Sequence, residues 1–84
     1  MKKLMMFSAV WCGPCQRTKP SFLALKESVT DVECQLVDVA DEGHLAEKYN
    51  IMSVPTFVLL NDGAEVARMS GGTTTEKLKE FISQ

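Results

Sequence analysis

The sequence predicts an α/β domain with one four-stranded mixed sheet, helices on both faces, and the order strand, helix, strand, helix, strand, strand, helix. Three observations support this prediction. The apolar run Leu4–Ser8 is too short for a helix and is typical of a strand buried on both faces. Apolar residues recur near helical spacing after Pro14. Asn61-Asp62-Gly63 separates two strand-like runs and therefore predicts a hairpin.

The size and composition of the chain limit the class of protein. Its 84 residues allow a single domain, residues 1–84, because a typical domain needs on the order of 100 residues. With 45% hydrophobic and 24% charged residues, the chain is expected to fold rather than stay disordered. Its net charge of -2 and scattered basic residues make nucleic acid and acidic membranes poor candidates as partners.

The first half of the chain predicts a right-handed crossover between two parallel strands. Leu4–Ser8 is expected at the centre of the sheet. Pro14 opens a helix that continues to about Ser28, and Pro20 inside this helix should bend it. Val32–Val39 then forms the second strand.

Alternation in the second strand predicts which of its side chains share a face. Cys34 and Leu36 are expected on one face, and Val37 and Val39 on the other. Both faces therefore carry apolar residues, which agrees with helices covering the sheet on both sides.

The second half predicts a short helix followed by an antiparallel hairpin. Asp41 is expected to cap a helix that ends at Tyr49. Thr56–Leu60 and Glu65–Met69 are the two strands of the hairpin.

A closing helix is predicted from a capping pattern and an apolar stripe. Thr73 and Glu76 have the spacing of a capping box. Leu78, Phe81 and Ile82 follow at helical spacing and form one apolar face.

The chemistry of the chain is expected at Cys12 and Cys15. They lie where the first strand ends and the first helix begins, one helical turn apart, so they can close a small disulfide ring. Cys12 at the helix N-terminus should have a lowered pKa, which makes it the better nucleophile. Cys15 lies a turn deeper and is expected to resolve the mixed disulfide that Cys12 forms.

A metal-binding role for this pair is the weaker interpretation, because such sites usually have a second closely spaced ligand pair. Cys34 and His44 are the only other soft ligands, and the predicted sheet has no reason to bring them together. Cys34 is instead expected to pack as a small hydrophobe, and His44 to be a solvated surface residue.

These residues together resemble the thioredoxin family. The resemblance rests on Trp11-Cys12-Gly13-Pro14-Cys15, Pro20, Val54-Pro55-Thr56, Asn61-Asp62-Gly63 and Gly71, and runs from about Leu4 to Ile82. It implies a minimal thioredoxin fold and a protein-disulfide reductase. It also implies that no cofactor is bound and that electrons come from NADPH through a separate reductase.

The resemblance further implies a substrate site around the cysteines. Pro55 would be a cis-proline facing them, the Val54 backbone would pair with an extended peptide, and Gly71 would complete a flat apolar groove. Gly13 and Pro14 would contact the substrate beside Cys12. Trp11 adjoins Cys12, and its position fits contact with the substrate or packing in the core equally well.

The sequence also departs from the thioredoxin pattern. The chain starts at the strand that leads into the cysteine motif, whereas thioredoxins usually have a further strand and helix before it. The family's buried aspartate falls at Met6, and the lysine beside it falls at Leu36. The two groups that would help to remove the proton of Cys15 are therefore missing, and we expect the resolving reaction to proceed without them.

Two other functions remain open from the sequence. The length and the Gly71-Gly72 pair also resemble glutaredoxin, which would couple the cysteines to glutathione, although Trp11 and the Gly13-Pro14 insert favour thioredoxin chemistry. A binding subunit with the same fold and dispensable cysteines is the third candidate.

Cysteine usage predicts a cytoplasmic protein, and the absence of an obvious surplus apolar surface predicts a monomer. Three cysteines cannot all pair within one chain, which favours a reducing compartment. The N-terminal lysines and apolar run imitate a secretory signal, but Trp11 stands where cleavage would need a small residue. No apolar stretch reaches the roughly 20 residues of a membrane span.

Overall fold

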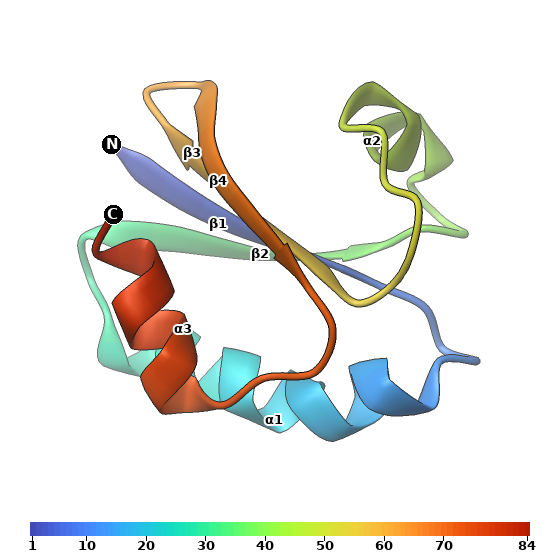
Figure 1. Cartoon of the computed structure of the whole chain (residues 1–84), viewed down its shortest axis with the longest axis horizontal. Helices are drawn as coiled ribbons and strands as arrows, with labels where there is room; N and C mark the ends of the chain where they lie inside the picture. The colour runs from blue at the N-terminus through green and yellow to red at the C-terminus, as the bar shows by residue number, and fades with distance from the viewer.

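The computed structural model describes all 84 residues and has the predicted element order (Figure 1). The strands and helices are β1 Lys2–Ser8, α1 Gly13–Ser28, β2 Val32–Asp38, α2 Gly43–Lys48, β3 Thr56–Asn61, β4 Ala64–Ser70 and α3 Thr75–Ile82. The strand order in the sheet is β2-β1-β3-β4. β1 pairs with β2 in parallel and with β3 antiparallel, and β3 pairs antiparallel with β4. The predicted mixed sheet is confirmed.

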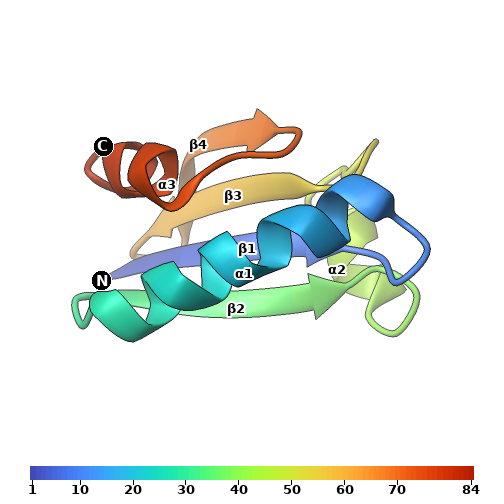
Figure 2. The ribbon, with the colours of Figure 1, turned by 90° about the horizontal axis from the view of Figure 1, so that it is seen from below.

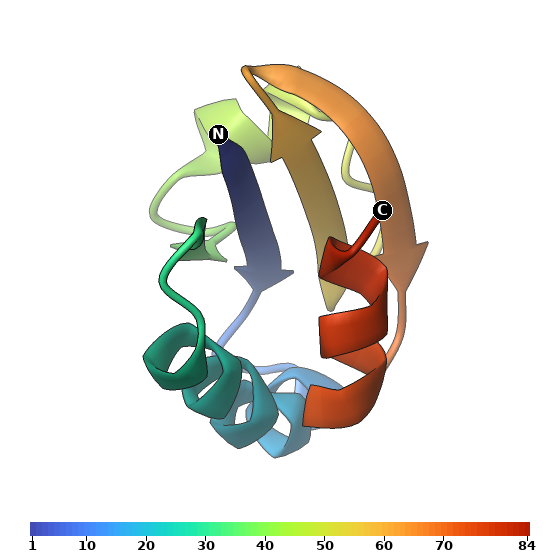
Figure 3. The ribbon, with the colours of Figure 1, turned by 90° about the vertical axis from the view of Figure 1, so that its left-hand side faces the viewer.

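Helices cover both faces of this sheet, as predicted. Figure 2 shows α1 and α3 over one face, with α2 behind the sheet. Figure 3 gives the side view, in which α1 and α3 again lie together and away from α2. No helix combines the length and the apolar character that crossing a membrane would require.

The centre of the sheet is β1, because its side chains are buried on both faces. Leu4 and Met6 point into one hydrophobic cluster, whereas Met5 and Phe7 point into the other. This alternation explains why the sequence of β1 is nearly continuous in apolar residues. β1 is longer than predicted, because Lys2 and Lys3 also pair with β2 and β3.

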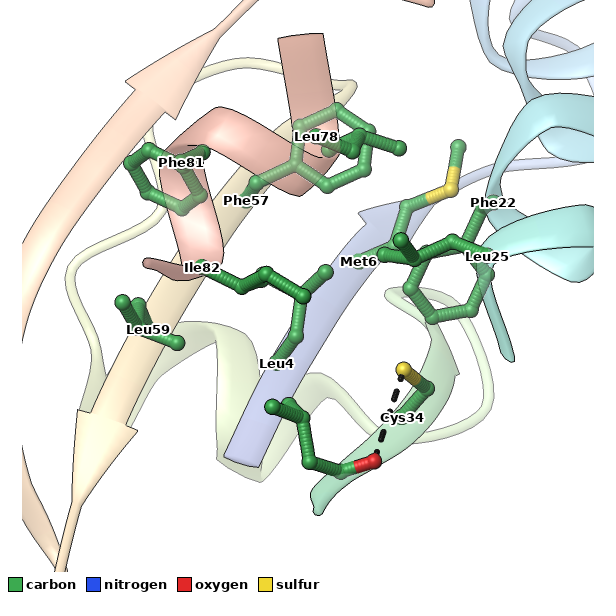
Figure 4. Close-up of a cluster of buried hydrophobic side chains, with 11 residues drawn as sticks. Leu4, Met6, Phe22, Leu25, Cys34, Phe57, Leu59, Leu78, Phe81 and Ile82 are labelled. Carbon is green, nitrogen blue, oxygen red and sulfur yellow. Dashed lines mark hydrogen bonds between the residues drawn. The ribbon is translucent and has the colours of Figure 1, made fainter. Parts of the chain in front are cut away.

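The main core lies between the sheet and the two helices α1 and α3 (Figure 4). Its buried residues are Leu4, Met6, Phe22, Leu25, Val32, Cys34, Phe57, Leu59, Leu78, Phe81 and Ile82. Leu78, Phe81 and Ile82, the predicted apolar face of α3, are therefore all buried in this core. Cys34 belongs to this core, as predicted for a small hydrophobe.

A second, smaller core lies on the α2 face of the sheet. Met5, Phe7, Val37, Val58 and Leu60 are buried there. α2 contributes half-buried side chains to this core and has no fully buried residue. The short helix is therefore the least firmly packed of the three.

The hairpin turn has the backbone that its sequence favours. Asp62 has a φ of 51° and Gly63 a φ of 88°, as a type I′ turn requires at its two central positions. β3 extends one residue beyond the prediction, to Asn61, and β4 one residue further at each end.

The cap predicted for α2 is wrong. Asp41 lies outside the helix, which begins at Gly43 after Glu42. Asp38, at the end of β2, accepts hydrogen bonds through Oδ1 from the backbone N–H of Ala40 at 2.8 Å and Asp41 at 3.4 Å. This side chain forms the turn that separates strand from helix.

The cap predicted for α3 is displaced by one residue. Thr74, not Thr73, is the N-cap, and its Oγ1 accepts a hydrogen bond from the backbone N–H of Lys77 at 3.3 Å. The Thr73 hydroxyl is buried without a hydrogen-bond partner. In α1, Pro20 lies inside the helix as predicted, and the bend expected there stays a prediction.

Candidate active site

The cysteine pair lies where the chain leaves β1 and enters α1. Cys12 is the N-cap of α1, and its Sγ accepts a hydrogen bond from the backbone N–H of Cys15 at 3.2 Å. Pro14 occupies the first turn, where its missing N–H removes no helical hydrogen bond. The sulfur of Cys12 thus lies at the positive end of the helix, which favours a thiolate.

Cys12 and Cys15 form a disulfide with their Cα atoms 5.3 Å apart. This separation lies within the usual range for bridged cysteines. Cys15 has no exposed surface and packs with Ala9 and the half-buried Val39 and Val54, whereas Cys12 retains 6% exposure. Cys12 is therefore the outer sulfur of the pair.

A second loop lies against the cysteines, as the resemblance implied. The peptide bond between Val54 and Pro55 is cis, and the Val54 carbonyl oxygen lies 3.6 Å from Cys12 Sγ. The carbonyl of Pro55 accepts a hydrogen bond from the backbone N–H of Gly71 at 2.9 Å. Gly71 has a φ of 95°, a conformation that favours glycine. The fold thus joins Val54, Pro55 and Gly71 at one end of the sheet.

An apolar groove of about 190 Å³ opens beside Cys12. Its lining residues are Trp11, Val39, Ala46, Ile51, Met52, Ser53 and Val54. Trp11 is 74% exposed and Met52 is 93% exposed, so two large apolar side chains face solvent at its rim. Such exposed apolar groups next to a reactive sulfur are typical of a surface that binds another molecule.

The structure places the remaining predicted residues unevenly around this groove. Gly13 and Pro14 are exposed beside Cys12 but do not line the groove, and neither does Gly71. Sequence reasoning missed Val39 and Ala46 as lining residues. Val39 directly follows β2, whose predicted end at Val39 is one residue too long, and Ala46 comes from α2; no local pattern connects them with the cysteine motif.

Two polar side chains of α1 lie near the motif. Gln16 donates a hydrogen bond from Nε2 to the carbonyl of Ala9 at 3.0 Å and so braces the loop before Cys12. The Arg17 side chain folds back along the helix, since a Cβ atom on Gly13 would lie 3.2 Å from its Nη1. Sequence reasoning did not identify the contact made by Gln16.

The other soft ligands lie apart from this site. His44 is exposed on α2. Cys34 is buried in the main core, and burial raises the pKa of its thiol. Nowhere does the fold bring together three His, Cys, Asp or Glu side chains in a cluster that could hold a metal ion.

Comparisons with known proteins agree with this geometry. The family model named Thioredoxin matches residues 1–84. A thioredoxin from Chlamydia caviae is 37% identical over 96% of this chain and 79% of its own length. The X-ray structure of Fasciola hepatica thioredoxin superposes with a TM-score of 0.91 at 40% identity, covering 98% of this chain and 78% of that one.

Some relatives are considerably longer than this chain. Thioredoxin H2 from Arabidopsis thaliana is 36% identical over 88% of this chain, but the matched part is only 56% of that protein. The family model nevertheless matches every residue of this chain, and the Chlamydia relative is matched over most of its own length. The chain therefore belongs to the thioredoxin family.

Proposed function

We propose that this protein reduces disulfide bonds in other proteins, with Cys12 as the attacking thiol and Cys15 as the resolving thiol. One observation carries the proposal. The outer sulfur of the pair lies at the N-cap of α1 and faces the Val54 carbonyl beside an apolar groove, while the inner sulfur is fully buried. A large substrate therefore meets Cys12 first.

The reaction consists of two thiol-disulfide exchanges. The Cys12 thiolate attacks one sulfur of the target disulfide, which forms a mixed disulfide and releases the other target sulfur as a thiolate. The Cys15 thiolate then attacks Cys12 Sγ, which closes the Cys12–Cys15 disulfide and releases the second target thiolate. The target gains two electrons, and its two thiolates take up two protons.

The substrate class follows from the surface beside Cys12. An extended polypeptide that carries a disulfide would lie along the groove, with its backbone next to Val54 and Pro55. Trp11 at the rim of the groove, and Gly13, Pro14 and Gly71 outside it, would contact the same peptide. The exposure of Trp11 and the apolar lining of the groove support a protein substrate rather than a small polar disulfide.

Partners and location complete the proposal. Two electrons must return to the oxidised pair, and a separate NADPH-dependent reductase is the expected donor. The chain would work as a monomer in the cytoplasm. The third cysteine supports a reducing compartment such as the cytoplasm, because Cys34 is buried and forms no disulfide.

A redox titration tests the chemistry directly. Trp11 is the sole tryptophan and adjoins Cys12, so its fluorescence should report the state of the pair. The titration would use a Cys34→Ala background in dithiol buffers of known potential. We expect one reversible two-electron transition that is more reducing than the glutathione pool. A transition well above that pool would contradict a reductase.

Trapping of the intermediate tests the two roles. Cys15→Ser should accumulate a mixed disulfide with oxidised insulin, because the resolving thiol is absent. Cys12→Ser should form no such adduct and should lose insulin reduction. If Cys12→Ser kept the activity, the assignment of the nucleophile would be wrong. If the variant without both cysteines restored a thioredoxin-dependent phenotype, the protein would be a binding subunit.

A further inference from the structure

We propose that Arg68 is a positioning residue for the substrate groove. Its guanidinium holds the C-terminal end of α2 against β4 and thereby sets the place of residues 51–54, which form one wall of the groove. The functional part of this inference rests on the proposed function. The structural part does not depend on it and is tested separately below.

The first step is the contact between Arg68 and the end of α2. Arg68 Nη2 donates a hydrogen bond to the Tyr49 carbonyl at 2.6 Å, and Nη1 donates to the Asn50 carbonyl at 3.4 Å. Carbonyls at a helix C-terminus have no amide partner in the helix, and they carry the negative end of its dipole. A planar cation with several donors suits both carbonyls at once.

The second step is the backbone that follows. Asn50 has a φ of 52°, so the chain turns sharply through a left-handed residue directly after the helix. Ile51, Met52, Ser53 and Val54 come next and all line the groove. Figure 1 shows this connection descending from α2 to the start of β3. A displacement of the Asn50 backbone would therefore also displace residues 51–54, which form the groove wall.

The third step concerns how else this segment is held. Ile51 N–H donates to the Ala46 carbonyl at 2.9 Å, and Thr56 Oγ1 donates to the Ser53 carbonyl at 2.7 Å. Both bonds join residues close in the chain. α2 buries no side chain completely. Tyr49 and Ile51 pack half-buried against the smaller core, where the Tyr49 ring lies 6.0 Å from that of Phe7, but these contacts hold side chains and not the carbonyls at the end of the helix. Arg68 supplies the hydrogen bonds that tie this end of α2 to the sheet.

Glu65 fixes the orientation of the guanidinium. Arg68 Nε donates to Glu65 Oε2 at 2.8 Å, and Nη2 donates to Oε1 at 2.9 Å, which makes a two-point ion pair. Residues three apart on a regular strand face opposite sides of the sheet. In β4 the register shifts, so that Leu60 pairs with Glu65 and Leu59 with Ala67, which leaves Val66 as an extra residue. This bulge brings Glu65 and Arg68 to the same face.

The test separates groove geometry from cysteine chemistry. Reduced protein is mixed with oxidised insulin or with hydroxyethyl disulfide, and acid-quenched samples give the second-order rate constant for each. The small disulfide reacts at Cys12 without needing the groove wall. For Arg68→Met we expect the insulin rate constant to fall by about tenfold, because misplaced binding groups slow a reaction whose chemistry is intact. The constant for hydroxyethyl disulfide should change by less than about twofold.

Three variants serve as matched controls. Lys79→Met removes one exposed cation on α3 that makes no contact with α2, and it should leave both rate constants unchanged. Glu65→Gln keeps both carbonyl bonds of Arg68 and should give a smaller loss with insulin. Arg68→Lys keeps the charge but not the planar fork, so it should restore only part of the insulin rate.

Amide hydrogen exchange tests the structural part without any activity. In Arg68→Met, the amides of residues 49–54 should exchange faster, while those of β1 and β3 stay unchanged. If these amides are unaffected, the positioning role is wrong. If they exchange faster but the ratio of insulin to hydroxyethyl disulfide rates stays constant, Arg68 only stabilises the fold. If wild type reduces neither disulfide, the proposed function fails, and hydrogen exchange still decides whether Arg68 holds the segment.

Discussion

Met6 on β1 and Leu36 on β2 are direct register partners in the parallel half of the sheet, and both pack in the apolar layer beneath α1. Met6 is completely buried. The resemblance to thioredoxins leads one to expect an aspartate and a lysine at these two positions. Cys15 also packs among apolar side chains, so we expect water or the Cys12 thiolate to accept its proton.

Met6→Asp should strongly destabilise the protein. A carboxyl group at this position would be surrounded by the main core, and Leu36 offers it no partner. We expect the free energy of unfolding to fall by about 3 kcal/mol or more near neutral pH, since a buried charge without a partner is costly. Urea unfolding measures this loss. Met6→Leu controls for the change of shape and should cost less than about 1.5 kcal/mol.

The double variant Met6→Asp/Leu36→Lys decides whether the two positions communicate. If the lysine pairs with the new carboxylate, the double variant should be more stable than the sum of the single changes predicts. Additive losses would mean that the side chains do not meet in spite of their register.

The fold could be predicted in detail because its signals are local. The apolar run of β1, the helical spacing after Pro14 and the Asp62-Gly63 turn each follow from neighbours in the chain, and the structure has all three. The position of the cysteines at the start of α1 follows from the same local reasoning. The cis bond at Pro55 came from the family resemblance alone, since most proline peptide bonds are trans.

The remaining features depend on distant contacts that no local pattern encodes. Arg68 and Tyr49 lie nineteen positions apart in the chain, and their contact requires the bulge in β4. The choice between Thr73 and Thr74 as cap depends on where the chain enters α3 after Gly71, and the capping-box spacing of Thr73 and Glu76 does not decide it. Val39 and Ala46 become groove residues only when α2 folds over the end of β2.

Glu65 should make the stability depend on pH in the acid range. The hydrogen bond from Arg68 lowers the pKa of its carboxyl group in the folded state. Glu65 therefore contributes stability above its unfolded pKa, and this contribution is lost as the pH falls through the lower folded value. The side chain is 35% exposed, so the contribution is less than about 1 kcal/mol.

The measurement compares wild type with Glu65→Gln by urea unfolding at several pH values. The difference in unfolding free energy should be largest near neutral pH and should shrink towards about pH 3. Added salt should also reduce it, since the pair is partly exposed. A difference that stays constant from neutral to acid pH would exclude a contribution from the ionised carboxylate.

The two threonines before α3 should respond in opposite ways to loss of the hydroxyl. Thr74→Ala removes the bond to the Lys77 amide and should lower the free energy of unfolding by about 1 kcal/mol. Thr73→Val replaces a buried hydroxyl that has no partner and should leave stability unchanged or raise it by a few tenths of a kcal/mol. Thermal and urea unfolding of both variants measure the contrast. Equal losses would show that Thr73 shares the capping role.

The Cys34 thiol should react slowly with alkylating reagents in the folded protein. Burial is the main cause that raises the pKa of its thiol, the nearby carboxylate of Glu33 adds to the rise, and the charge of Lys26 opposes it. In a Cys12→Ser/Cys15→Ser background, Cys34 is the only cysteine, so its alkylation by iodoacetamide can be followed by mass alone. At about pH 8 the folded protein should react on the order of 100-fold more slowly than the urea-unfolded chain, because the reactive form is the accessible thiolate. Lys26→Met should slow the folded reaction further and leave the unfolded rate unchanged. Similar rates for folded and unfolded protein would contradict the burial of this thiol in the core between β2 and α1. Cys34 would then react alongside Cys12 with thiol reagents.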